Sequence, residues 1–109
     1  EPLYVIKLDA ATKQVVVGPR EALAQTHVEL HSMNWLSADT APREVMVKLR
    51  SAMAPLPARI ELQADGRAML TLLAPHYGAA PGQAAVVYDA GRVLGGGFIA
   101  RAKTQAQAA

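Results

Sequence analysis

The chain has 109 residues, a length that suits one small domain. Apolar residues make up 51% of the chain, which is enough to build a core and excludes an intrinsically disordered segment. The formal net charge is +2 and cysteine is absent, which excludes disulfide frameworks and thiolate metal sites. No apolar run approaches the roughly 18 residues that a membrane span needs, and no secretory signal pattern opens the chain.

The start of the chain indicates a piece of a longer protein. It opens with Glu1-Pro2, lacks an initiator methionine and enters a strand-like run almost at once. The lack of cysteine is compatible with a cytosolic origin. We therefore expect a cytoplasmic domain of a larger polypeptide, with no membrane contact.

The first third of the chain is predicted to form a β-hairpin, a helical turn and a longer strand. Apolar runs over residues 3–8 and 14–17 indicate two strands joined by a hairpin-sized link. Because proline is tolerated at the first position of a helix, residues 19–24 are predicted to form one short helical turn. Partial alternation of apolar and polar residues over 26–35 predicts a third strand.

A small, polar segment over residues 37–42, which ends in proline, is the best candidate for a linker. Beyond it the alternation becomes sharper and indicates a strand with one apolar and one polar face. The face predicted to point inward carries Val45, Val47 and Leu49, and the face predicted to point outward carries Met46, Lys48 and Arg50.

A hairpin is predicted in the middle of the chain. Alternation over residues 58–63 indicates a strand, and two prolines interrupt the chain before it. Asp65-Gly66 indicates a tight turn, because left-handed backbone conformations are cheap for glycine and tolerable for aspartate. The returning strand is predicted over residues 67–73.

The last third is predicted to contain a loop and three further strands. The loop is expected over residues 75–82, and the strands over 84–88, 92–94 and 98–100. Several short strands separated by turn signals at this spacing indicate an all-β fold, in the form of a small antiparallel barrel or a Greek-key sandwich.

Three consecutive glycines, Gly95-Gly96-Gly97, invite comparison with a phosphate-binding loop. Such a loop needs a following Lys-Ser/Thr and a helix, and the residues after Gly97 supply neither. The favoured interpretation is a bulge or a tight crossing, where a neighbouring backbone or ring leaves no room for a Cβ atom.

Catalytic and metal-binding patterns are weak. His27 and His31 share a strand face without a third ligand in view, and His76 is predicted to lie alone in a loop. Carboxylates are scattered, and no serine or threonine has an obvious base beside it. The residues on their own therefore indicate a binding module rather than an enzyme.

Basic residues gather in one part of the chain. The stretch from position 43 to 59 carries four cations and one acid, namely Arg43, Lys48, Arg50 and Arg59 against Glu44. A local basic stripe is a modest indication of a phosphate-bearing partner. From charge alone, a solvated strand face is the favoured alternative.

Several stretches in the right order resemble the carboxy-terminal region of the tRNA-specific 2-thiouridylase family (MnmA/TrmU). The strongest is Pro81-Gly82-Gln83 followed by Val-x-Tyr and then Leu94-Gly95-Gly96-Gly97-Phe98-Ile99, which resembles the closing signature of that family. The resemblance extends to residues 2–6, 16–18, 34–35 and 47–51, and so covers nearly all of the chain up to position 101.

The resemblance implies a small antiparallel Greek-key β-barrel, like the second domain of translation GTPases, that helps to hold tRNA. It implies that the full-length enzyme replaces the C2 oxygen of the wobble uridine with sulfur, with ATP as cofactor and a sulfur-donor protein as partner. The ATP-binding loop and the catalytic cysteines of the family belong to an amino-terminal domain. No catalytic residue and no cofactor are therefore expected in this fragment.

The resemblance also implies tRNA contacts. The family's Arg-Tyr pair corresponds to Arg50 and Ser51, and the Gln of its Pro-Gly-Gln corresponds to Gln83. Serine in place of tyrosine removes any stacking contact and leaves a hydroxyl. We add Lys48, which the alternation places on the same face as Arg50.

Three segments are expected: a lead-in hairpin and connecting segment over residues 1–38, which belongs to the family's central region, a β-barrel over 43–102, and a flexible tail over 103–109. The alternative function is a non-catalytic β-barrel that binds another protein.

Overall fold

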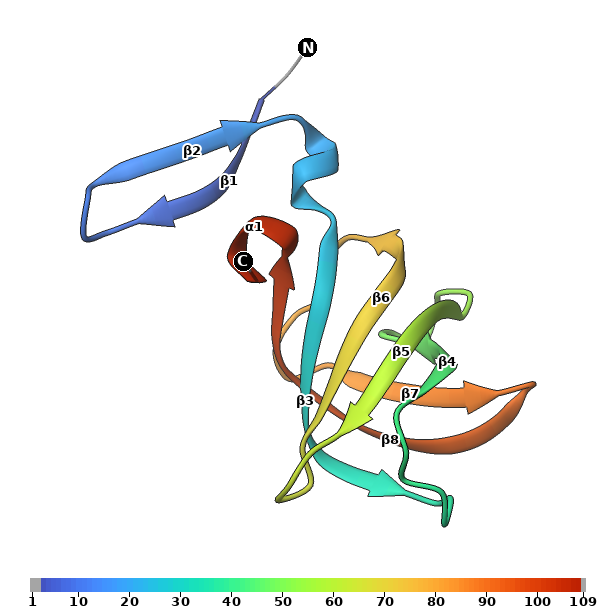
Figure 1. The fold of residues 1–109 in the computed structure, drawn as a ribbon. Helices are drawn as coiled ribbons and strands as arrows, with labels where there is room; N and C mark the ends of the chain where they lie inside the picture. The colour runs from blue at the N-terminus through green and yellow to red at the C-terminus, as the bar shows by residue number, and fades with distance from the viewer. Residues whose placement is uncertain (1–2, 109) are drawn as a thin grey trace.

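The computed structural model describes residues 3–108, apart from the side chains at positions 6, 7, 9 and 16. The first two residues of the predicted lead-in and the last residue of the predicted tail lie outside the described residues. The strands are β1 (Tyr4–Asp9), β2 (Gln14–Gly18), β3 (Gln25–Trp35), β4 (Arg43–Lys48), β5 (Leu56–Leu62), β6 (Ala68–His76), β7 (Ala84–Asp89) and β8 (Arg92–Thr104). A 3-10 turn, η1 (Arg20–Leu23), and one helical turn, α1 (Gln105–Ala108), complete the elements in Figure 1.

Six strands close into an antiparallel barrel in the order β3-β6-β5-β4-β7-β8. Strands β4, β5 and β6 are consecutive neighbours, and β7 returns to lie beside β4, which is the Greek-key arrangement. The predicted all-β, small antiparallel barrel is confirmed. The barrel also includes β3, which the sequence pattern groups with the lead-in segment.

The core of the barrel comes from the alternating residues of its strands. In β4, the predicted inward residues Val45 and Val47 are buried, and Leu49 just beyond the strand is buried too. The fully buried large side chains are Val28, Leu30, Val47, Leu49, Ile60, Leu70, Val87, Leu94 and Ile99. Burial of such side chains, at about 1.5–3 kcal/mol each, is the main force that closes the barrel.

The glycine run lies inside β8, where this strand passes between β3 and β7. A Cβ atom at Gly97 would lie 2.7 Å from the carbonyl oxygen of His31, and one at Gly96 would lie 2.8 Å from that of Ala85. A Cβ atom at Gly95 would meet the Asn34 carbonyl oxygen. The interpretation as a tight crossing is confirmed, because the adjacent backbones leave no space for side chains.

The turns that join β5 to β6 and β7 to β8 contain residues in the left-handed backbone conformation. Asp65 and Gly66 have φ values of +61° and +70°, as the predicted tight turn between β5 and β6 requires. Ala90 and Gly91, between β7 and β8, have φ values of +51° and +84°.

Several predicted boundaries differ from the structure. The two strands predicted over residues 92–94 and 98–100 are one continuous strand, β8, which runs through the glycine run. The prediction of a loop from position 75 is wrong for its first two residues, because β6 continues to His76, which pairs with Gln25 of β3. Residues predicted as tail continue β8 to Thr104 and then form α1. There the Thr104 hydroxyl accepts from the Gln107 N–H at 3.3 Å, and the Gln107 side chain accepts from the Thr104 N–H at 2.9 Å. This reciprocal pair is a capping box, a local reason for the helical turn.

The hairpin of β1 and β2 lies beyond one end of the barrel, on the same side as α1 (Figure 1). Its register shifts between Val5 and Lys7, so that Val5 pairs with Val17 and Leu8 pairs with Val15. Since cross-strand partners share a face, this bulge brings all four apolar residues onto one face. Each of the four is about half exposed or more.

A single turn, η1, connects the hairpin to the barrel. The guanidinium of Arg20 in η1 lies 3.9 Å from the ring centre of Tyr77, just beyond β6. This cation–π contact joins the connecting turn to the end of the barrel. No helix within residues 3–108 is long and apolar enough to cross a membrane.

Candidate nucleic-acid interface

The predicted contact residues come from the two segments that meet where β4 ends and β7 begins. Lys48 pairs with Val86, so the antiparallel register carries the chain after β4 toward the turn before β7. Arg50 and Ser51 follow β4, and Gln83 precedes β7. The fold therefore gathers all four predicted residues at one end of the barrel.

Arg50 is exposed and lies in a bend rather than on the strand, contrary to the prediction, because β4 ends at Lys48. Two hydrogen bonds hold this bend. The Leu49 N–H donates to the sulfur of Met53 at 3.2 Å, and the Met53 N–H donates to the carbonyl oxygen of Arg50 at 3.5 Å. The guanidinium makes no ion pair with a described side chain. It is free to receive an anion in its forked geometry.

His76 is the titratable neighbour of Arg50. His76 is the last residue of β6 and is 8% exposed. Burial lowers the pKa of the His76 ring, and the charge of Arg50 lowers it further. The sequence pattern gives no sign of this electrostatic coupling, since only the closed barrel brings the charge of Arg50 within reach of His76.

Gln83 is held in place by its own amide oxygen. Oε1 accepts from the Ala80 N–H at 3.0 Å, while the Gln83 carbonyl oxygen accepts from the Ile99 N–H at 2.8 Å. Gly82, with φ of +88°, allows the tight turn before it. The side-chain nitrogen makes no hydrogen bond to another described residue, so it remains a donor for a phosphate or base edge.

Ser51 is exposed in the turn after Arg50, and its hydroxyl makes no hydrogen bond within the described part of the chain. Lys48 is half-buried and lines a groove of about 350 Å³ together with Met46, Pro55 and Tyr88. Like Arg50, it has no acidic partner among the described side chains.

Several other cations have an acid as an ion-pair partner or as a cross-strand neighbour. Arg43 forms an ion pair with Asp89 across β4 and β7, and Arg59 lies opposite Glu44 across β4 and β5. Glu29 on β3 lies 3.1 Å from the Lys103 ammonium and 3.8 Å from the Arg101 guanidinium. Of the four cations in the predicted basic stripe, Lys48 and Arg50 are therefore the two that have neither an ion pair nor an acidic cross-strand neighbour among the described residues.

The remaining histidines have local partners. His27 lies 2.8 Å from the Thr26 hydroxyl, and His31 lies 2.9 Å from the Ser32 hydroxyl. Within residues 3–108, as far as their side chains are described, no three His, Asp or Glu side chains gather as a metal site would require.

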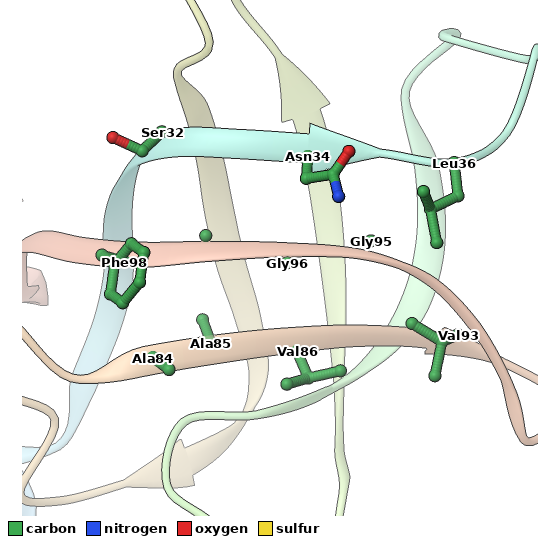
Figure 2. A pocket seen from close by; sticks show the side chains of 11 residues that line it. Ser32, Asn34, Leu36, Ala84, Ala85, Val86, Val93, Gly95, Gly96 and Phe98 are labelled. Atoms are coloured by element: carbon green, nitrogen blue, oxygen red, sulfur yellow. The ribbon is translucent and has the colours of Figure 1, made fainter.

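A second groove, of about 380 Å³, crosses the outer face of β3, β8 and β7. Figure 2 shows its bare centre at Gly96, with Asn34 of β3 on one side and Val86 of β7 on the other. Phe98 stands at one end of this groove, and Leu36 and Val93 at the other. The lining carries no charged side chain, so this groove suits an apolar partner better than a phosphate.

The glycine run does not have the form of a phosphate-binding loop. Its glycine run is packed in a strand against neighbouring carbonyl groups, whereas a phosphate loop presents free N–H groups to its ligand. The three glycines therefore serve the packing of β3, β8 and β7.

Comparison with known proteins agrees with the fold. Residues 25–99 match the family model described as the aminomethyltransferase β-barrel domain. These residues begin at the first strand of the barrel and leave out the hairpin.

Close relatives carry one name. The tRNA-specific 2-thiouridylase MnmA of Rhodospirillum centenum is 57% identical over 104 residues, which cover 94% of this chain and 26% of that protein. Those of Sphingopyxis alaskensis and Zymomonas mobilis are 55% and 54% identical, each over 91% of this chain and 25% of the relative. The chain spans about a quarter of the length of these relatives. It belongs to the aminomethyltransferase β-barrel domain family, as the carboxy-terminal barrel of the tRNA-specific 2-thiouridylases.

Proposed function

We propose that this chain is the tRNA-binding domain of a tRNA 2-thiouridylase and that it takes part in the reaction by holding the substrate. The name of the relatives supplies tRNA as the substrate class. One observation supports the role of the barrel: Lys48 and Arg50, two residues apart, have no acidic partner among the described side chains. Unpaired cations favour a nucleic-acid backbone, because binding releases the counterions of its phosphates.

The contacts have separate roles in this proposal. Arg50 binds phosphate oxygens with its guanidinium fork, and Lys48 adds a point charge beside it. The Ser51 hydroxyl donates one further hydrogen bond. The amide nitrogen of Gln83, whose oxygen is fixed by Ala80, donates to the backbone or a base edge.

In the full-length enzyme, the resemblance implies sulfur transfer to C2 of the wobble uridine in the cytoplasm. ATP, the catalytic cysteines and the sulfur-donor protein belong, in this proposal, to polypeptide outside these 109 residues. The barrel keeps the tRNA in position while that chemistry proceeds.

The alternative is a barrel that binds another protein, and the uncharged groove over Gly96 is the observation that favours it. A salt titration separates the two functions. With labelled tRNA, the chain is expected to bind weakly, with a Kd of about 10⁻⁴ to 10⁻⁶ M at physiological salt. The logarithm of the affinity should fall with the logarithm of salt concentration, with a slope of about −2 for two phosphate contacts. No binding at low salt, or binding that salt does not weaken, would refute the RNA-binding role.

A further inference from the structure

The groove beside Lys48 combines a cation with an aromatic ring. Met46 and Tyr88 are cross-strand partners on β4 and β7, and Lys48 and Val86 are the next pair on the same face toward the end of β4. Pro55 and Gly91 close the groove, whose volume is about 350 Å³. Val45 and Val47, which alternate with Met46 and Lys48, point into the core, so the groove lies on the outer face of the barrel.

We propose that this groove binds one unpaired nucleotide of the RNA, with its base against the ring of Tyr88 and the side chain of Met46 and its phosphate at the Lys48 ammonium. The inference rests on the proposed RNA-binding function and extends it from the backbone to a base. Tyrosine rings accept bases by stacking with little regard to sequence, and a nearby cation holds the phosphate.

Charge gives the nucleotide one orientation. Tyr88 also lines a smaller hollow of about 200 Å³, whose lining includes Glu44 and Asp89 instead of Lys48. The carboxylate of Asp89 is neutralised by Arg43, whereas Lys48 in the groove has no acidic partner among the described side chains. A phosphate is therefore drawn to the Lys48 side, which also leads toward Arg50.

The size and chemistry of the groove favour a single nucleotide over a duplex. Its volume of about 350 Å³ is near the lower end of the range for small-molecule sites. Within a duplex the faces of the bases are stacked and cannot reach a ring on the protein. An unpaired base can leave its stack and lie on Tyr88.

The test measures binding of a labelled short oligouridylate and of labelled tRNA to the chain and its variants. Tyr88→Leu should weaken oligouridylate binding about fivefold or more, because one stacking contact is lost. Tyr88→Phe keeps the ring and should bind like the parent chain. An abasic oligonucleotide of the same length should bind the parent chain and Tyr88→Leu equally.

Tyr4→Leu is the matched control, because Tyr4 is an exposed tyrosine on the hairpin. It should leave oligouridylate binding unchanged, and circular dichroism should show that all variants fold. Equal oligouridylate affinity of Tyr88→Leu and the parent chain, with tRNA binding still dependent on Arg50, would overturn the nucleotide site and leave the proposed function standing. If the parent chain binds neither RNA at low salt, both proposals fail.

Discussion

The barrel and the hairpin use the same kind of apolar strand and bury it very differently. Val28, Val47 and Val87 in the barrel are fully buried. On the hairpin face, Val5 and Val15 are 51% and 58% exposed. Composition alone does not distinguish the two regions.

Closure explains the difference. A barrel covers the inner face of each strand with the strands opposite, and it leaves no open edge. A two-stranded hairpin has neither property and is at best marginally stable alone. We propose that the hairpin belongs to the neighbouring central region of the full-length enzyme, which would cover its apolar face, as the expected boundary between lead-in and barrel implies.

The largest effect should separate core from hairpin. Leu70→Ala removes a fully buried side chain from β6 and should lower the free energy of unfolding by about 2–5 kcal/mol. Val15→Ala on the exposed hairpin face should change it by less than about 0.5 kcal/mol. Urea unfolding of the two variants measures both changes. A similar decrease in the free energy of unfolding for both would contradict the contrast between the buried core and the exposed hairpin face.

Within the barrel, the glycine run of β8 should tolerate substitution less well than an exposed strand position, because the neighbouring backbones leave no room for side chains there. Gly97→Ala would place a methyl group 2.7 Å from the His31 carbonyl oxygen. Overpacking of this kind should cost about 1–3 kcal/mol of unfolding free energy. Ala84→Ser, at an exposed position on β7, serves as the control and should be nearly neutral. An unaltered thermal midpoint for Gly97→Ala would contradict the packing argument.

We expect the barrel, and not the hairpin, to carry the tRNA-binding residues. Arg50→Ala should weaken tRNA binding by the full-length protein by about 1–3 kcal/mol, the loss expected for a charge-assisted contact. Lys13→Asn removes an exposed cation from the hairpin turn, where Lys13 has φ of +56° and asparagine is well tolerated. That variant should retain its affinity in an anisotropy titration at low salt. The assignment fails if the hairpin variant loses as much affinity as Arg50→Ala.

The smallest effect is a pH dependence at the barrel end. The pKa of His76 is lowered below 6.5 in the folded chain by burial and by Arg50. The unfolded chain therefore binds more protons near and below pH 6.5, and stability should fall as pH decreases from that value toward the folded pKa. Urea unfolding at neutral and mildly acidic pH should show a larger loss for the parent chain than for His76→Gln. Equal losses would mean that His76 is not responsible.

Much of the fold follows from local patterns. Alternation at Val45 and Val47 predicts the buried face of β4, and Asp65-Gly66 predicts the tight turn. Thr104 and Gln107 form a capping box with the three-residue spacing of that motif, which the prediction of a flexible tail over residues 103–109 overlooks.

The candidate site depends on what the barrel brings together. Arg43 and Asp89 are 46 positions apart, so their pairing requires the β4–β7 ladder. The same closure brings His76 within the electrostatic reach of Arg50 and places Tyr88 and Lys48 in the lining of one groove. A pattern of charges along the chain cannot separate neutralised cations from free ones, because the partner acids come from distant strands.

The most direct measurement is a titration of the ¹⁵N-labelled chain with tRNA, followed through its backbone amide signals. The account predicts that the largest changes fall at Lys48, Arg50, Ser51 and Gln83, with the hairpin signals little changed. Changes centred on β1 and β2, or on the groove over Gly96, would contradict the claim that this end of the barrel holds the RNA.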